Sequence, residues 1–203
     1  MSSSEVIDTI VRLEWEDFSR VLEEEGRAPC QRRPDVFARM RRAMLGTWSA
    51  ELLDAHLEDV ENARGAGRSP MTEKLAWMGE ATGSPRFRAA AAMLPMPPYE
   101  TFERIERAVK LHLVWQARAG ALFPRLTSGG RPLLTEDDGG GTASFETCLR
   151  GELRTYSPRS IEVFERYALA CWRDGVNLAV WELDNVARSY GFADAAEAER
   201  SRG

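Results

Sequence analysis

This 203-residue chain has only three Cys and two His, so it contains few residues that could bind a transition metal or form a disulfide. The cysteines (Cys30, Cys148 and Cys171) are odd in number and lack metal-site spacing, which fits a reducing cytoplasm. The helical zinc and di-iron motifs, with His and Glu at fixed spacings, are absent. We therefore expect a cytoplasmic protein with no metal and no cofactor.

Long apolar runs and concentrated basic charge are also missing. No hydrophobic stretch approaches the ~20 residues that a membrane-spanning helix needs. The start, MSSSEVIDTI, lacks the basic and apolar regions of a secretory signal. The net charge of −5 argues against nucleic acid, which prefers basic surfaces. The partner that remains is a small-molecule ligand or substrate, and a homodimer is one alternative for the oligomeric state.

Lysine is nearly absent too, with two residues against 25 arginines. This skew, together with the many alanines, suggests a GC-rich bacterial coding sequence. What the chain does have is 43% hydrophobic residues and six Trp, enough for a sizeable core. Its length fits one domain.

Nearly every segment has the pattern of a helix. The Ser-Pro pairs at Ser69, Ser84 and Ser157 combine an N-cap residue with proline at the first helical position. Residues 98–122 have apolar side chains on two sides, which predicts a long central helix. No segment alternates like a strand. We predict an all-α fold, a single-domain compact bundle of about seven or eight helices over residues 1–203.

Two segments differ from this pattern. Residues 124–143 are rich in glycine and predict a long irregular loop that could act as a hinge or lid. Residues 194–203 begin with a capping box formed by Asp194 and Glu197, and we expect them to form a frayed helical tail.

Two glutamates occupy helical positions where apolar residues are expected. Glu152 is central in the apolar stripe of residues 144–157, and Glu14 is near the middle of the stripe in the first helix. On a helix that turns about 100° per residue, both carboxylates point toward the core. Burying an unpaired carboxylate is costly, so each needs a partner. The pattern therefore predicts a polar site inside the bundle.

The functional interpretation makes Glu14 and Glu152 catalytic, as general acid and base in a partly dry pocket. One structural alternative is a salt bridge to Arg27, Arg41 or Arg150, because perturbed carboxylates also occur in structural networks. The other is simple exposure at the surface, if the helices pack in another orientation. The sequence leaves these interpretations open.

Arg150 and Arg27 are candidates for binding an anionic group of a substrate, since a guanidinium can bind a carboxylate or phosphate bidentately. Arg150 could equally pair with Glu146 one turn away. The following Gly151 weakens the helix by about 1 kcal/mol relative to alanine, which suggests close approach of another backbone or a ligand.

Three more residues complete the candidate substrate-binding set. Tyr156 ends the Glu152 stripe, and a buried tyrosine hydroxyl needs a partner. His112 lies on the apolar face of the central helix. It could act as a general base or a metal ligand. The favoured alternative is a core histidine with a satisfied hydrogen bond. Lys74 lies in the segment TEKLAWM. His56, by contrast, falls on an acid-rich helix and is expected to be exposed.

Cys30 is a candidate reactive thiol. It precedes a predicted helix start and lies among arginines, and both features lower a thiol pKa. Isolated cysteines are more often small buried residues. Cys148 and Cys171 fall within apolar stripes, and we expect both in the core.

Several segments together point to a known family: EWEDF (14–18), EGRAPCQ (25–31), TEKLAWM (72–78), SFETCLRGELRTYS (144–157) and NL…YG within 177–191. The chain resembles, over about residues 5–192, the bacterial family called domain of unknown function 4125. The family pattern has Tyr where this chain has Phe145 and Cys148. The resemblance implies a small, soluble, helical bacterial protein, with specialised metabolism as a setting, and it transfers no catalytic residue.

These observations favour a small-molecule enzyme that uses carboxylate general acid/base chemistry. Isomerase, cyclase, lyase or hydrolase chemistry fits best, because no redox or nucleotide motif is visible. The alternative is a non-catalytic helical module that binds a protein or a ligand, for which an exposed apolar patch would be expected.

Overall fold

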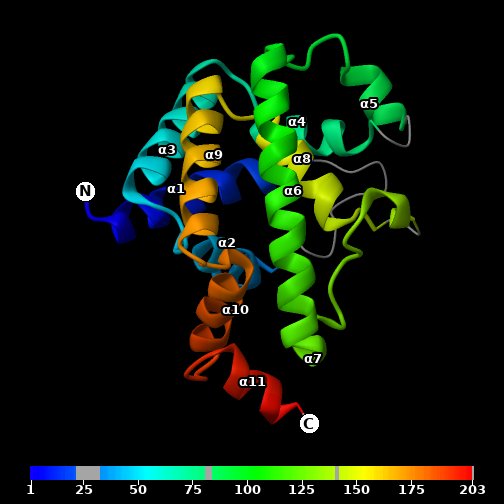
Figure 1. Cartoon of the computed structure of the whole chain (residues 1–203). Helices are drawn as coiled ribbons and strands as arrows, with labels where there is room; N and C mark the ends of the chain where they lie inside the picture. Colours follow the sequence, from blue (N-terminus) through cyan, green and yellow to red (C-terminus); the bar gives the residue numbers. More distant parts are fainter. Residues whose placement is uncertain (22–32, 81–83, 140–141, 203) are drawn as a thin grey trace.

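The computed structural model describes residues 1–21, 33–80, 84–139 and 142–202. Over these residues the chain forms eleven α-helices and one short 3₁₀ helix, with no β-strand, which confirms the all-α prediction (Figure 1). The predicted number of about seven or eight helices is too low. A turn at residues 46–49 separates two helices, and short helices form where the sequence indicated a loop.

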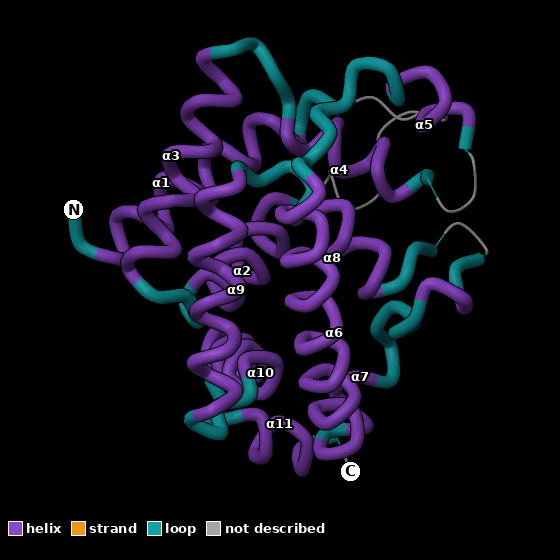
Figure 2. The backbone as a smooth tube through the Cα atoms, turned by 45° about the horizontal axis from the view of Figure 1, so that its top comes forward, coloured by secondary structure: helices purple, strands orange, loops and turns teal. Residues whose placement is uncertain are grey.

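The tube view shows helices joined by short turns and a few longer loops (Figure 2). None of the described helices is both long and apolar enough to cross a membrane. In chain order, the elements are α1 (Ser3–Phe18), α2 (Pro34–Leu45), α3 (Ala50–Gly65), α4 (Pro70–Met78), α5 (Pro85–Ala90), α6 (Tyr99–Leu122), α7 (Pro124–Thr127), η2 (Thr135–Asp137), α8 (Phe145–Leu153), α9 (Pro158–Arg173), α10 (Leu178–Ser189) and α11 (Ala195–Ser201).

Serine N-caps begin many of these helices. At Ser69, Ser84 and Ser157 the side chain accepts a hydrogen bond from a backbone N–H three residues later, and proline follows at the first helical position. This confirms the three Ser-Pro starts. Ser49 and Ser144 cap α3 and α8 in the same way, without the proline. These caps satisfy N–H groups that have no partner inside the helix.

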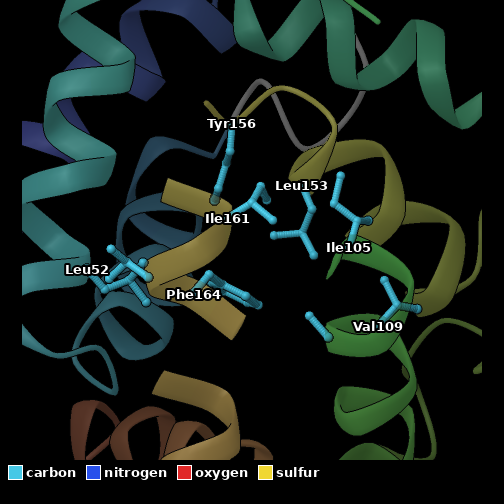
Figure 3. Packing of buried hydrophobic residues seen from close by; sticks show 9 residues of the cluster. Leu52, Ile105, Val109, Leu153, Tyr156, Ile161 and Phe164 are labelled. Carbon is cyan, nitrogen blue, oxygen red and sulfur yellow. The ribbon is translucent and has the colours of Figure 1, made fainter. Parts of the chain in front are cut away.

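The centre of the bundle lies beside α6 and α9, which pack against each other (Figure 1). The central cluster contains buried residues of α3, α6, α8 and α9, with Leu153, Tyr156 and Ile161 among them (Figure 3). Fully burying a large apolar side chain stabilises the fold by roughly 1.5–3 kcal/mol. Two further clusters pack α1 with α2 and α3, and α6 with α9 and α10.

The segment 124–143, expected to be an irregular loop, contains α7 and η2. Its end is held against α8, because Asp138 accepts hydrogen bonds from the backbone N–H of Ser144 (2.6 Å) and the hydroxyl of Thr147 (2.7 Å). Residues 140–141 lie outside the described part of the chain. The described part of this segment is therefore tied to the helix that contains Glu152.

The tail 194–203, expected to be frayed, instead forms a docked helix, α11. Glu199 is buried, and its carboxylate accepts hydrogen bonds from the backbone N–H groups of Arg125 and Leu126, both at 2.9 Å. These groups lie in the first turn of α7, so Glu199 caps a helix that precedes it by more than 70 residues. Ala195 and Ala198 bury the inner face of α11.

Gly151 lets α8 approach α4 closely. A Cβ atom at this position would lie 3.0 Å from Cγ of Met78 and 3.1 Å from the carbonyl oxygen of Lys74. The close approach of a neighbouring backbone, predicted from this glycine, is therefore confirmed. Because Lys74 and Glu152 lie on the two helices that meet here, Gly151 also sets their separation.

Gly151→Ala should lower the free energy of unfolding by about 1–3 kcal/mol, because the added methyl group overpacks the α4–α8 contact. Gly120→Ala is the matched control, since a Cβ there meets only Thr127 Oγ1, at 3.9 Å. It should leave stability unchanged or raise it by up to about 1 kcal/mol, because alanine favours helix. Urea unfolding followed by circular dichroism measures both. Equal stability of Gly151→Ala and the wild type would contradict the packing role.

Candidate functional site

Five helices bring six polar side chains together, which we call the Arg41 network. Its members come from α1, α2, α3, α4 and α8 with the residue shortly after α8; they are Glu14, Arg41, His56, Lys74, Glu152 and Tyr156. The side chains of Glu14 and Glu152 are only 11% and 15% exposed. Both glutamates therefore point inward, as their positions in the apolar stripes predicted.

Arg41 is the shared counter-ion of the two glutamates. Its Nε donates to Glu14 Oε2 at 2.7 Å, and its Nη2 donates to the other oxygen of the same carboxylate. Its Nη1 donates to Glu152 Oε1 at 3.0 Å. A planar guanidinium suits this arrangement, because its N–H groups diverge in a fixed fork. Of the two candidate arginine partners that the structure describes, Arg41 and Arg150, it is Arg41 that joins both glutamates.

Glu152 has two further partners. Lys74 Nζ donates to Oε2 at 2.5 Å, and the Tyr156 hydroxyl donates to Oε1 at 2.9 Å. Burial by itself would raise the pKa of Glu152, but the charges of Arg41 and Lys74 outweigh it and hold the pKa well below its usual value. Burial, with the nearby Glu152 charge, raises the pKa of Tyr156 well above its usual value. Glu152 is thus an anion and Tyr156 a neutral donor.

Glu14 is paired in a similar way. His56 Nε2 lies 2.9 Å from Glu14 Oε1, and Arg41 binds both carboxylate oxygens. Burial opposes ionisation, but Arg41 and His56 together lower the pKa of Glu14. Both glutamates therefore remain ionised at neutral pH.

His56 is buried at 4% exposure, so the prediction that it is exposed is wrong. The acids of α3, such as Glu51 and Glu58, point outward, whereas His56 shares the inner face of the helix with Leu52. Its ring packs against Tyr156 at 4.7 Å between centroids. Among the described residues, its Nδ1 is buried without a hydrogen-bond partner.

Two cavities adjoin the network. The smaller, ≈ 50 Å³, lies beside α1, α3 and α4, and the larger, ≈ 230 Å³, lies among α6, α8 and α10. Lys74, Glu152 and Tyr156 line both cavities and so form the wall between them. The larger cavity has apolar and aromatic walls, together with a small polar set: His112, Gln116, Arg131, Cys148 and Glu182.

Glu182, on α10, is the residue that sequence reasoning missed. It lines the larger cavity, and no described residue pairs with its carboxyl group through a hydrogen bond or an ion pair. Burial raises its pKa to about 7; the charge of Arg41 opposes this rise, and the charge of Glu152 adds a smaller increase. The signal was in the sequence, since Glu182 lies one turn after Leu178 and one turn before Val186 in an apolar stripe.

His112 also faces the larger cavity. Its Nδ1–H donates to the carbonyl oxygen of Ala108 at 2.9 Å, so the neutral ring has its lone pair on Nε2. Burial lowers the pKa of His112 to about 4, which keeps the ring neutral at pH 7. Its ring stacks on Phe164 at 5.1 Å between centroids. His112 is thus a hydrogen-bonded histidine, as favoured from the sequence, that borders a cavity.

The two cysteines expected in the core differ. Cys171 is buried, whereas Cys148 is only half-buried and lines the larger cavity. Arg131 Nη1 lies 2.8 Å from Cys148 Sγ. Burial raises the pKa of the Cys148 thiol, so it is not an activated nucleophile.

The remaining sequence candidates lie outside this arrangement. Arg150 lines neither cavity and pairs instead with Glu106 at 2.8 Å and with Glu146 at 2.7 Å, the second one turn away as the structural alternative predicted. Arg27 and Cys30 lie in residues 22–32, outside the described part of the chain. Within the described ranges, no three or more His, Cys, Asp or Glu side chains are grouped as metal ligands would be.

Replacing Arg41 by methionine should lower the free energy of unfolding by about 3–5 kcal/mol at pH 7, because two buried carboxylates lose their shared counter-ion. The loss should shrink as the pH falls below 4.5, the ordinary pKa of the glutamates, since protonation removes the unpaired charges. Urea unfolding between about pH 2.5 and pH 8 measures this dependence.

Arg42→Met is the matched control, because Arg42 and its partner Asp8 are 52% and 57% exposed. Its effect should stay below about 1 kcal/mol at every pH. Similar losses for the two variants would show that Arg41 has no special role in stability.

Comparison with known proteins places the chain in one family. No curated protein and no solved structure matches it. A family model described as "Protein of unknown function (DUF4125)" matches residues 4–200, which is nearly the whole chain and agrees with the resemblance seen in the sequence. The chain therefore belongs to the DUF4125 family.

Proposed function

We propose that the protein is an enzyme that binds a small organic molecule in the larger cavity and transfers a proton by way of Glu182. The observation that supports this most directly is Glu182 itself, a carboxyl group with a pKa of about 7 that lines a ≈ 230 Å³ cavity. A general acid or base works best when its pKa lies near the working pH. A perturbed pKa in a cavity is a common mark of a functional site.

Glu14 and Glu152 take a different part in this proposal from the one expected. Their lowered pKa values make them poor proton donors at neutral pH. Instead, Glu152 fixes Lys74 and Tyr156 at the edge of the cavity through hydrogen bonds of 2.5 and 2.9 Å. Proton transfer then belongs to the unpaired carboxyl group of Glu182, and the paired glutamates organise the site.

The lining of the cavity suits a ligand with an apolar body and a few polar groups. Trp48, Phe145 and Phe164 supply aromatic walls. Gln116 can donate and accept hydrogen bonds, and His112 Nε2 can accept one. Such mixed lining is typical of small-molecule sites, where a few polar groups set the orientation of the ligand. Isomerisation, cyclisation, elimination and hydrolysis all need the proton transfer that Glu182 would supply.

A second candidate is a module that binds a ligand without converting it. The closed ion pairing of Glu14, Arg41 and Glu152 favours it, because such pairing rigidifies a scaffold without any catalytic role. The two candidates differ in whether a compound that binds is also consumed.

A screen of small organic compounds, followed by mass spectrometry for product, tests the proposal. For any compound converted, Glu182→Gln should lower kcat by roughly 10²–10⁴-fold, because the proton-transfer group is lost. The kcat/KM of the wild type should show an inflection near pH 7, the pKa of Glu182. Glu162→Gln, an exposed residue of α9, is the control and should leave kcat unchanged. Binding without conversion would favour the second candidate, and full activity of Glu182→Gln would exclude Glu182.

The raised pKa of Glu182 also predicts a pH-dependent effect on stability. The folded protein keeps the proton up to about pH 7, whereas the unfolded chain loses it near 4.5, so ionisation destabilises the fold as the pH rises through this window. Glu182→Gln removes that penalty. Relative to the wild type, the variant should gain roughly 2–3 kcal/mol in free energy of unfolding between pH 4 and pH 8. A difference that does not change with pH would contradict the raised pKa.

A further inference from the structure

Lysine is scarce in this chain, and one of its two lysines lies at the wall between the cavities. Lys74 lines both cavities, with a side chain that is 20% exposed, whereas Lys110 is exposed on α6. At 25 positions the basic residue is arginine. An arginine can hold an ion pair with Glu152, but only a lysine can lose a proton and act as a nucleophile. The chemistry of the amine is therefore a reason for lysine at this position.

We propose that Nζ of Lys74 forms an imine with an aldehyde or ketone substrate held in the larger cavity. This inference rests on the proposed function and deepens it, because it names a carbonyl compound as the class of substrate. The supporting geometry is that Lys74 lines the larger cavity and that its Nζ lies 2.5 Å from Glu152 Oε2, a residue of the same lining.

The step balances without any further reagent. The Lys74 ammonium group gives one proton to solvent water, and the nitrogen lone pair then forms a bond to the carbonyl carbon while the C–O π bond opens. The carbonyl oxygen takes one proton back from solvent and a second from the nitrogen, and it leaves as water as the C=N bond forms. The nitrogen keeps one hydrogen and its positive charge. Glu152 stays ionised throughout the step.

The surroundings of Lys74 suit a cation that persists through the reaction. Glu152 is held as an anion by Arg41 and by the Tyr156 hydroxyl, at 3.0 and 2.9 Å, so it can pair with the iminium as it does with the ammonium. Gly151 brings the backbone of α4 against α8, which keeps Lys74 close to Glu152. The charge balance of the network is therefore the same before and after imine formation.

Imine formation also gives Glu182 a chemical task. An iminium withdraws electrons from the neighbouring C–H bond and makes its proton easier to remove. Glu182 lines the same cavity and, with a pKa of about 7, is ionised in part at neutral pH. Lys74 would thus activate the substrate, and Glu182 would move the proton.

Reductive trapping tests the imine directly, and the chain suits the experiment because only two lysines can react besides the N-terminus. The folded protein is treated at pH 7 with butanal or benzaldehyde in the presence of sodium cyanoborohydride, and peptides are mapped by mass spectrometry. Lys74 should become alkylated at least about tenfold faster than the more exposed Lys110, because its site favours imine formation. In urea the two lysines should react at similar rates.

Two variants sharpen the result. Lys74→Arg should lose the fast adduct while it keeps the ion pair with Glu152 and a melting temperature close to that of the wild type. Lys110→Arg should keep the fast adduct. Alkylation of Lys110 as fast as that of Lys74 in the folded protein would overturn the proposal.

The outcome is separable from that of the proposed function. Trapping reports labelling at Lys74 and does not depend on Glu182, so Glu182→Gln should still form the adduct. If Lys74 is not selectively trapped but Glu182→Gln loses turnover, the imine is excluded and the proton-transfer function stands. If Lys74 is trapped but Glu182→Gln retains full activity, the amine is reactive and the role of Glu182 is excluded.

Discussion

Arg41 has to neutralise two carboxylates that are far apart in the sequence, and the arrangement of the bundle depends on it. A buried carboxylate without a partner would cost several kcal/mol, and Glu14 and Glu152 share this one guanidinium. The fork geometry of arginine requires α1, α2 and α8 to meet at a fixed spacing and orientation. Lys74 and His56 then add α4 and α3 to the same contact. A single charged centre thus joins five helices that apolar packing alone would hold less specifically.

The same centre divides the polar residues into two kinds. Inside the network, Glu14, Glu152 and Arg41 are paired, and their charges are fixed at neutral pH. Glu182 stands outside it and, among the described residues, has no partner of its own. Burial raises the pKa of Glu182, and the charge of Arg41 opposes this rise more strongly than the charge of Glu152 adds to it. Burial without a partner, and not the network, therefore makes Glu182 available for proton exchange.

Local patterns in the sequence were enough to predict much of this. The Ser-Pro pairs located helix starts because capping is a local interaction, and the inward direction of Glu14 and Glu152 followed from helical periodicity. Gly151 indicated a close contact because a glycine inside a helix is unfavourable unless a neighbour needs the space. The partner of the two glutamates was not predictable in the same way, because Arg41 was one of several arginines and the choice depends on how α2 packs. The prediction for His56 was wrong because the many acids of α3 suggested an exposed helix, although its inner face is apolar. Glu182 was overlooked although, like Glu14, it occupies a position in an apolar helical stripe.

The contact between Glu152 and Arg41 spans 111 residues, and this separation has a consequence for synthesis on the ribosome. Glu14, Arg41, His56 and Lys74 all emerge well before Glu152, so a nascent chain can pair Glu14 with Arg41 while Lys74 still has no carboxylate to bind. The nine-residue helix that contains Lys74 is too short to be stable by itself. It can contact α1 early, because the backbone N–H of Met71 donates to Asp17, but its most extensive contact, with α8, forms only after α8 is synthesised. The final packing of α4 and the assembly of the cavity wall therefore depend on a later part of the chain.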